Sequence, residues 1–347
     1  KTEGIDPTEV HLPKFLPDSP EVRSDLADFI FEVQWFDSHL QRMLDHLESI
    51  GEADNTLVIV TSDNGMPFPR AKANLYEYGI HMPLAMRWPA MWPAEQQDHH
   101  LTSLIDVTRT IFEAAEVAPK QEDQLSGHSL VSALREPGSK HIVRRSSVYS
   151  GRERHSSSRF HSLGYPCRCL RTDTHLYIRN FTPRRWPAGT PQKYSGAKFD
   201  LNNQLVTGKL GPMGGGYHDI DDGPTLRWMV ANQSTNRVKQ LMEAAVALRP
   251  SEELFDIQND PACMNNLANH PDYKEMIENL SARLENYLTE TGDLRVTAPK
   301  AAHQWEMYPR YSSLRWFPEP DWWSETPNRV PTQPWLESRR PRDKQSK

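Results

Sequence analysis

A long amphipathic helix followed directly by a short apolar strand is the pattern that most constrains this chain. Asp18 or Ser19 can cap the helix, Pro20 lies in its first turn, and apolar residues recur every three or four positions until Gly51. Residues 56–61 (Thr-Leu-Val-Ile-Val-Thr) follow and are typical of a buried parallel strand. Such a pair is the second half of a βαβ unit, so the sequence predicts an α/β fold. The expected buried stripe of the helix comprises Val22, Leu26, Phe29, Ile30, Val33, Phe36, Leu40, Met43, Leu44, Leu47 and Ile50.

Helices and strands continue to alternate over the first 150 residues. Residues 83–88 predict a second strand, and residues 147–150 predict a third. Asp106 is placed to cap a helix that runs to Val117, and residues 129–134 predict a shorter helix. The buried stripe expected on the longer helix comprises Val107, Ile111, Phe112 and Ala115.

The pattern of apolar and polar residues changes after residue 151. Residues 171–180, and residues 253–256 with their flanks, predict strands of a smaller antiparallel sheet. Residues 272–289 predict an amphipathic helix, and a glycine-rich loop at 211–216 lies between these elements. Residues 295–347 are rich in proline and tryptophan, and we expect them to wrap the surface or pack on a neighbouring subunit.

Composition and charge argue against several classes of protein. The formal net charge is -6, so the chain has no electrostatic footprint for nucleic acid. Three cysteines cannot form a disulfide framework, and we expect no zinc site. No apolar run approaches the roughly 18 residues that a membrane-spanning helix needs. The basic cluster near the end of the chain is interpreted as a solvated tail and comprises Arg339, Arg340, Arg342, Lys344 and Lys347.

The strongest local signal for chemistry follows the first apolar strand. Residues 61–65 read Thr-Ser-Asp-Asn-Gly, and functional sites of α/β sheets form at the carboxyl ends of strands. Asp63 and Asn64 offer adjacent carboxylate and amide oxygens, which calcium and similar hard cations prefer, and Gly65 permits a sharp turn. A plain Asp-Asn-Gly turn is the commoner meaning of these three residues taken alone.

The residues that follow favour the metal site. Residues 61–84 resemble the second signature of the sulfatase family, in which a strand ending in Ser-Asp-Asn-Gly is followed by a lysine or arginine and then by Leu-Tyr-Glu-x-Gly-x-x-x-Pro. Here the basic residue is Lys72, and residues 75–83 supply the remainder. The form Asp-Asn-Gly-x-Pro-Phe-Pro at 63–69 is similar to heparan N-sulfatases (N-sulfoglucosamine sulfohydrolases) and their bacterial relatives in particular.

The resemblance continues on both sides of this signature. Residues 6–26 look like the stretch that precedes it in heparan N-sulfatases, and residues 164–171 match the Tyr-Pro-x-Arg-x-x-Arg segment of that subgroup. Residues 250–268 resemble the late family motif with Glu-Leu-Tyr-Asp, Asp-Pro and Asn-Leu. The resemblance therefore covers about residues 5–295 and leaves out the tail.

This resemblance implies a fold and a division of the chain. The fold would be the C-terminal part of an alkaline phosphatase-like α/β sandwich, plus a smaller C-terminal α+β subdomain with an antiparallel sheet. The implied boundaries are 1–150 for the second half of the catalytic α/β domain, 151–295 for the subdomain and 296–347 for the tail.

The resemblance also implies roles at the site. Asp63 and Asn64 match two ligands of the calcium ion that sulfatases bind, with Mg²⁺ as the alternative ion. Lys72, nine positions after Asp63, matches the basic residue that contacts the sulfate, so it is the expected catalytic and substrate-binding residue. On its own, Lys72 would be read as a solvated surface lysine.

Further polar residues fall where heparan N-sulfatases contact their substrate. These are Glu153, Arg154 and His155, of which His155 is favoured as a sugar contact. The following loop is longer than in those enzymes, and a solvated loop is the alternative interpretation. For Arg168 and Arg171 the alternatives are contact with an anionic substrate and salt bridges at strand edges, of which we expect the salt bridges.

Other motif residues are expected to be structural. Glu77, Gly79 and Pro83 should hold the motif loop against the sheet, and His81 is not expected to bind a ligand. Asp260 should shape a turn beside the smaller sheet.

The formylglycine nucleophile of the family, which is made from Cys or Ser in a Cys/Ser-x-Pro/Ala-x-Arg motif, has no match here. Residues 167–171 have the outer spacing but Cys169 at the Pro/Ala position, and Cys263 lacks the arginine. The early acidic calcium ligands are absent as well. We therefore expect the chain to be the C-terminal part of a sulfatase, with formylglycine on the missing N-terminal portion, and to be inactive and poorly folded alone.

The resemblance implies a sulfuric ester or sulfamate hydrolase that acts on sulfated sugars through a calcium-assisted formylglycine mechanism. Two alternatives stay open, a phosphomonoesterase or phosphonate hydrolase of the same superfamily and a non-catalytic sulfatase-like binding protein. The expected partners are a sulfated sugar or glycosaminoglycan and the missing N-terminal portion, with neither nucleic acid nor a membrane span. The substrate class alone suggests the periplasm, the extracellular space or lysosomes.

Overall fold

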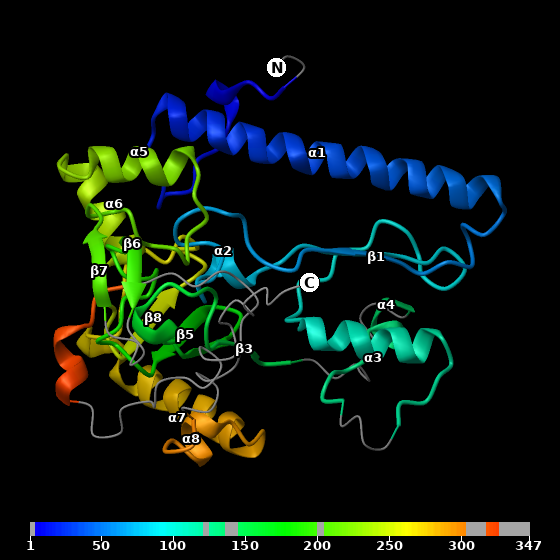
Figure 1. Ribbon diagram of the computed structural model, residues 1–347. Helices are drawn as coiled ribbons and strands as arrows, with labels where there is room; N and C mark the ends of the chain where they lie inside the picture. Colours follow the sequence, from blue (N-terminus) through cyan, green and yellow to red (C-terminus); the bar gives the residue numbers. More distant parts are fainter. Residues whose placement is uncertain (1–3, 121–124, 136–144, 200–204, 303–316, 326–347) are drawn as a thin grey trace, which may run out of the picture.

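The computed structural model describes residues 4–120, 125–135, 145–199, 205–302 and 317–325. Its elements form two regions (Figure 1). The N-terminal region, residues 4–135, holds one very long helix, two strands and short helices. The C-terminal region, residues 145–302, holds a four-stranded antiparallel sheet, a hairpin and four helices of the described chain. None of the helices in the described residues has the length and apolar character needed to cross a membrane.

The long helix forms where the sequence predicts it. Helix α1 spans Pro20–Ser49, and the Ser19 hydroxyl accepts a hydrogen bond from the Val22 amide at 3.3 Å, as an N-cap does. Its apolar face is buried only near its start, in a cluster that includes Phe15 and Phe68. The prediction that the whole stripe is buried is therefore wrong in this structure. The apolar side chains of α1 that stay exposed include Phe31, Val33, Trp35, Phe36 and Met43.

The elements that pack against α1 explain this difference. They are the 3-10 helix η1, Pro7–Glu9, and helix α5, Pro224–Asn232. Figure 1 shows α5 beside the N-terminal end of α1, while the remainder of α1 runs on above β1. The described residues thus supply a packing partner for the first turns of α1 and leave its later apolar positions uncovered.

The first strand also has other neighbours than predicted. Strand β1, Val58–Thr61, pairs antiparallel with β2, Leu84–Arg87, and helix α2, Glu77–Ile80, lies between them in sequence. The β1 side chains are half-buried, except for the exposed Thr61. The position of the strand is confirmed, but the prediction of a fully buried parallel strand is wrong within the described residues, because β2 is its paired strand there.

Helix α3, Leu104–Ala114, begins at a different cap from the predicted one. Ser103 is the N-cap, and Asp106 lies three residues later, where its carboxylate accepts a hydrogen bond from the Ser103 amide at 2.8 Å. The predicted apolar stripe is wrong as well, since Ile111 is exposed and the buried positions are Asp106 and Thr110. Both of these buried polar groups are satisfied by the segment that leads into α4, Val131–Arg135.

The smaller antiparallel sheet is confirmed. Its order is β3, β4, β5, β8, and every neighbouring pair is antiparallel. Helix α7, Lys274–Glu290, covers one face through its leucines, and the 3-10 helix η4, Pro271–Tyr273, precedes it. The strands are β3 Val148–Arg152, β4 Cys167–Arg171, β5 His175–Asn180 and β8 Glu252–Asp256.

The other face of the sheet packs against the motif loop of the N-terminal region. Leu75 and Tyr76 lie in one buried cluster with Tyr165, Ile178 and Phe255, so the loop after β1 is part of the core of the sheet. The Tyr76 hydroxyl donates a hydrogen bond to Glu253 at 2.8 Å. This contact fixes the motif loop relative to the C-terminal region.

Several elements of the C-terminal region had no clear signal in the sequence. A hairpin of β6, Tyr194–Phe199, and β7, Leu205–Leu210, leads into the glycine-rich loop. Helix α5 and helix α6, Asn236–Val246, follow it. The remaining short elements are η3 Phe160–Ser162, α8 Leu294–Thr297 and η5 Asp321–Glu325. Most of the predicted tail, including its basic cluster, lies outside the described residues.

Candidate functional site

The motif loop between β1 and β2 folds tightly on itself because two of its glycines touch the backbone. A Cβ on Gly65 would lie 2.2 Å from the Tyr78 carbonyl oxygen, and a Cβ on Gly79 would lie 2.4 Å from the Asn74 carbonyl oxygen. Real Cβ contacts are never this short, so only glycine fits at either position. The structural role predicted for Gly79 is confirmed.

Lys72 has a fixed backbone within this loop. Its amide donates to the Met66 carbonyl at 3.1 Å, and its own carbonyl accepts from the Asn74 side chain at 3.0 Å. Arg249 in turn donates to the Asn74 amide oxygen at 2.6 Å. The buried guanidinium of Arg70 donates to two carbonyl oxygens of the C-terminal region. The backbone of Lys72 is thus held from both regions of the molecule.

The Lys72 ammonium forms an ion pair with Asp221, its Nζ lying 2.9 Å from Oδ2. Both side chains are partly exposed, at 27% and 44%. Asp221 follows the glycine-rich loop, 149 residues further along the chain. Sequence reasoning missed Asp221, and the only signal for it was an acidic run next to that loop.

His155 belongs to the same group of charges. Burial lowers the pKa of its imidazole, and the positive charges of Arg152 and Lys72 lower it further. The carboxylates of Asp219 and Asp221 act in the opposite direction but do not restore the ordinary value. The structure therefore brings His155 and Lys72, two of the predicted site residues, into one electrostatic neighbourhood.

Asp219 anchors the segment that carries His155. Its carboxylate accepts from the Ser156 amide at 2.9 Å and from Arg159 at 2.5 Å, and both charged side chains of the pair are buried. Burial alone would raise the pKa of Asp219, but the Arg159 and Arg152 guanidiniums overcome this and hold the pKa well below its usual range. Arg159 also donates to the Trp186 carbonyl at 2.6 Å, so the pair ties two loops together.

Glu153 and Arg154 lie beside His155 in sequence but have other contacts. The Glu153 carboxylate accepts from Arg168 and from Arg295, each at 2.6 Å. Arg154 donates to the Ser162 carbonyl at 3.4 Å. The carboxylate of Glu153 is thus held in a network of ion pairs, and its predicted contact with a substrate stays a prediction, as does that of Arg154.

The predicted structural ion pairs of the motifs are present. Arg168 also pairs with Asp293 at 2.7 Å, and Arg171 pairs with Glu77 at 2.8 Å, so the salt bridges expected at the strand edges are confirmed. Glu77 is buried and pairs with His81 at 2.9 Å as well. These contacts hold α2 against the sheet and agree with the structural role expected for Glu77.

Asp63 and Asn64 lie at the end of β1 with oxygens that are free to bind. The Asn64 side chain donates through Nδ2 to the Gly65 carbonyl at 3.1 Å, which leaves its amide oxygen without a hydrogen bond among the described residues. The Asp63 carboxylate is exposed and makes no ion pair or hydrogen bond within the part of the chain described. This donor set suits a hard cation, although no group of three or more His, Cys, Asp or Glu side chains that could hold a metal occurs in the described ranges.

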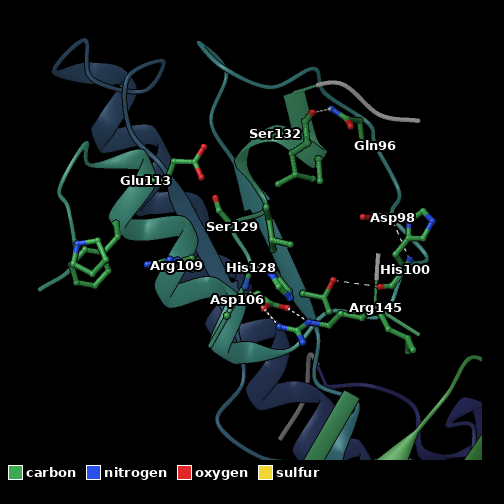
Figure 2. A pocket seen from close by; sticks show the side chains of 18 of the residues that line it. Gln96, Asp98, His100, Asp106, Arg109, Glu113, His128, Ser129, Ser132 and Arg145 are labelled. Atoms are coloured by element: carbon green, nitrogen blue, oxygen red, sulfur yellow. Dashed lines mark hydrogen bonds and ion pairs between the residues drawn. The ribbon is translucent and has the colours of Figure 1, made fainter. Parts of the chain in front are cut away.

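Two cavities lie apart from Asp63 and Asn64. One, of about 690 Å³, is shown in Figure 2, where Arg145 reaches across to Asp106 and donates to it at 3.0 Å through Nε. The other, of about 1480 Å³, extends from β2 to β3. Neither is lined by Lys72 or His155, so the predicted site lies in neither of them.

Comparison with known proteins agrees with the sequence motif. Residues 9–117 match the family model described as Sulfatase. These residues of the chain belong to the sulfatase family. The chain is 27% identical to human N-sulphoglucosamine sulphohydrolase over 323 residues, which is 90% of this chain and 57% of that protein. It is 24% identical to an ulvan-active sulfatase of Formosa agariphila over 287 residues, 82% of this chain and 42% of the other.

A solved structure supports the same fold for this chain. A candidate sulfatase of Bacteroides fragilis superposes with a TM-score of 0.50 at 16% identity and covers 81% of this chain and 47% of its own. The mixed α/β architecture with antiparallel sheets is thus that of the alkaline phosphatase-like fold. The chain spans about half the length of the curated relatives that it matches.

Proposed function

We propose that this chain supplies part of the active site of an enzyme that hydrolyses sulfate groups on sugars. The observation that carries the proposal is the sulfatase-type loop, whose Lys72 is fixed by backbone contacts and lies near His155. Relatives named for ulvan and for N-sulphoglucosamine support a sulfated sugar as the substrate class. Such substrates favour a place outside the cytoplasm.

The proposed role of Lys72 is to bind a sulfate oxygen. An ammonium group carries three N–H donors, and Asp221 takes one of them, so two can point at an anion. Positive charge fixed where negative charge develops stabilises the transition state, and a lysine does this as a compact point charge. The constrained backbone of Lys72 limits the reorganisation needed for that contact.

His155 is the proposed sugar contact. Because burial lowers the pKa of its imidazole, the ring is neutral at neutral pH. A neutral ring can donate through one nitrogen and accept through the other, which suits the hydroxyl groups of a sugar. Asp219 and Arg159 fix the segment after His155 and so help to hold the ring in position.

Asp63 and Asn64 are the proposed ligands of a divalent cation, calcium or magnesium. Such an ion, when bound, acts as a Lewis acid on the sulfate oxygens. Calcium takes about 6–8 oxygen ligands, so these two residues would form only part of the coordination shell. The remaining ligands would come from elsewhere in the protein.

The nucleophile is proposed to be a formylglycine outside the described residues. The three cysteines of this chain are Cys167, Cys169 and Cys263, and all are buried. Burial raises the pKa of each thiol, to about 12 for Cys263, which makes these groups inert rather than reactive. Their environment supports a structural role.

The test is a hydrolysis assay of the complete protein that contains this chain, with para-nitrophenyl sulfate and with glucosamine N-sulfate. Lys72→Ala should lower kcat/KM about 10²–10³-fold, as loss of an oxyanion donor does. Lys239→Ala is the matched control, because Lys239 is an exposed helical lysine that pairs loosely with Glu243 at 3.9 Å. Absence of sulfate hydrolysis in the wild type, or full activity of Lys72→Ala, would refute the proposal.

A further inference from the structure

Asp221 is placed to adjust the charge of the proposed sulfate site. Its carboxylate lies 2.9 Å from the Lys72 ammonium and acts electrostatically on His155. The pair joins two segments that each have a fixed backbone. On the second segment, the Ile220 amide donates to the Tyr217 carbonyl at 2.9 Å, and the Ile220 side chain is buried in the cluster around α5 and α6.

The charges around His155 nearly balance. The positive groups are Lys72 and Arg152, together with the buried Arg159 behind them, and the negative groups are Asp219 and Asp221. The Asp219 carboxylate already forms a buried ion pair with Arg159. Asp221 is the partly exposed carboxylate of this set, so it is the one that an incoming anion would meet.

A carboxylate beside the anion-binding ammonium penalises a substrate in proportion to its charge. A sulfate ester or sulfamate carries one negative charge, whereas a phosphate ester carries close to two at neutral pH. We infer that Asp221 is a specificity-determining residue, which makes the Lys72 site select singly charged sulfuryl groups over doubly charged phosphoryl groups. This inference rests on the proposed function of Lys72 and adds to it the choice between two classes of ester.

The strength of this effect follows from Coulomb's law. One unit charge about 6 Å from a bound anion, at an effective dielectric constant of about 40, changes affinity roughly tenfold for each additional anionic charge. Asp221→Asn keeps the shape of the side chain and removes its charge. The substitution should therefore improve binding of a dianion about tenfold more than binding of a monoanion.

The experiment measures binding rather than turnover, in the complete protein that contains this chain. Phenylsulfonate is the monoanionic probe, and phenylphosphonate is a probe of similar shape that is dianionic above its second ionisation. Calorimetry gives both dissociation constants for the wild type, for Asp221→Asn and for Asp222→Asn. Asp222 is the matched control, because it is the adjacent carboxylate and pairs with Arg227 at 2.6 Å on the exposed surface.

The expected result is that Asp221→Asn reduces the preference for sulfonate over dianionic phosphonate about tenfold. Asp222→Asn should leave that preference unchanged. In the wild type, lowering the pH below the second ionisation of the phosphonate should bring the two affinities together, and this arm needs no variant to fold.

Two outcomes would overturn the inference, and they have different consequences for the proposed function of Lys72. In the first, both probes bind, but the ratio of their dissociation constants is the same in wild type and Asp221→Asn or does not change with the charge of the phosphonate. Asp221 then does not select by charge, although Lys72 can still bind sulfate. If neither probe binds the wild type, the anion site itself is absent, and the proposed function falls together with the inference.

Discussion

The two regions of this molecule place similar amphipathic helices in very different surroundings. In the C-terminal region, Leu284 of α7 is 1% exposed and packs with the leucines of the sheet. In the N-terminal region, Trp35 and Met43 of α1 are 59% and 63% exposed. Both helices have the apolar periodicity that predicts burial, so the difference lies in what is opposite each helix. An uncovered apolar face of this extent marks a surface that needs a partner.

The candidate site lies where these two regions meet. The motif loop starts at β1 in the N-terminal region, but its Tyr76 belongs to the core of the C-terminal sheet. Lys72 therefore takes its position from the better-packed region, and so does its partner Asp221. By contrast, Asp63 stands at the exposed end of β1. The comparison teaches that the proposed anion-binding half of the site is preformed, while the proposed metal-binding half would need further ligands from outside the described residues.

The largest effect is expected at the buried ion pair of the C-terminal region. Asp219→Asn should destabilise the chain by about 3–5 kcal/mol, because it leaves the Arg159 charge buried without its partner. Urea unfolding measures this. The pKa of Asp219 is lowered in the folded state, so its stabilisation is present above the ordinary carboxyl pKa and is lost as the pH falls below it. The difference between wild type and variant should shrink in acid, and a constant difference would contradict this account.

The next effect contrasts the two helices directly. Leu284→Ala should cost about 2–5 kcal/mol, since it opens a cavity in a packed core. Met43→Ala should change the free energy of unfolding of this chain by less than about 0.5 kcal/mol, because the Met43 side chain is largely exposed. Urea unfolding of both variants decides the matter. Equal costs would show that the apolar face of α1 is covered in solution, for example by a second copy of the chain.

A smaller effect is expected in the motif loop. Gly65→Ala should destabilise by about 1–3 kcal/mol, because the new methyl group would meet the Tyr78 carbonyl oxygen at 2.2 Å. Gly4→Ala is the control, since nothing lies within 4 Å of a Cβ at that position. Thermal unfolding measures both. Tolerance of alanine at position 65 would mean that the loop is not as tightly folded as the backbone contacts indicate.

Local patterns predicted the elements that are stabilised by near neighbours. The cap at Ser19 and the periodicity of α1 are encoded within a few residues, and both are confirmed. The burial of α1 and the partner of β1 depend on what packs beside them, and there the predictions failed. The cap of α3 was misplaced, because Asp106 occupies the other half of a capping box whose Ser103 was overlooked. The hairpin of β6 and β7 was not predicted, because its mixed polar sequence lacks the regular alternation of apolar and polar residues that indicates a strand.

For the site, a contiguous motif was informative and distant pairing was not. Lys72 and the structural roles of Glu77 and Gly79 followed from one stretch of sequence. Asp221 could not be predicted, because no local pattern in the sequence indicates that two residues 149 positions apart will form an ion pair. Glu153 was predicted to contact a substrate, while its carboxylate forms ion pairs with Arg168, 15 residues away on β4, and with Arg295, 142 residues away on α8.

The smallest expected effect compares one histidine from each region. The pKa of His81 is raised, chiefly by its hydrogen bond with Glu77, whereas burial lowers the pKa of His155. Titration of the ring protons by NMR, assigned with His81→Asn and His155→Asn, should give midpoints on opposite sides of about 6.5, the ordinary value for histidine. Two midpoints on the same side would contradict the surroundings described for one of these rings.

The two rings should also make the free energy of unfolding depend on pH in opposite ways. The contribution of His81 is present below the ordinary histidine pKa and is lost as the pH rises through its raised value. The contribution of His155 is present above the ordinary value and is lost as the pH falls through its lowered value. The His81 side chain is 69% exposed, so its contribution should not exceed about 1 kcal/mol. Removing His81 should therefore flatten the alkaline side of the plot of stability against pH, and removing His155 should flatten the acidic side. If His81 instead affected the acidic side and His155 the alkaline side, the charged neighbours of the two rings would act differently in solution.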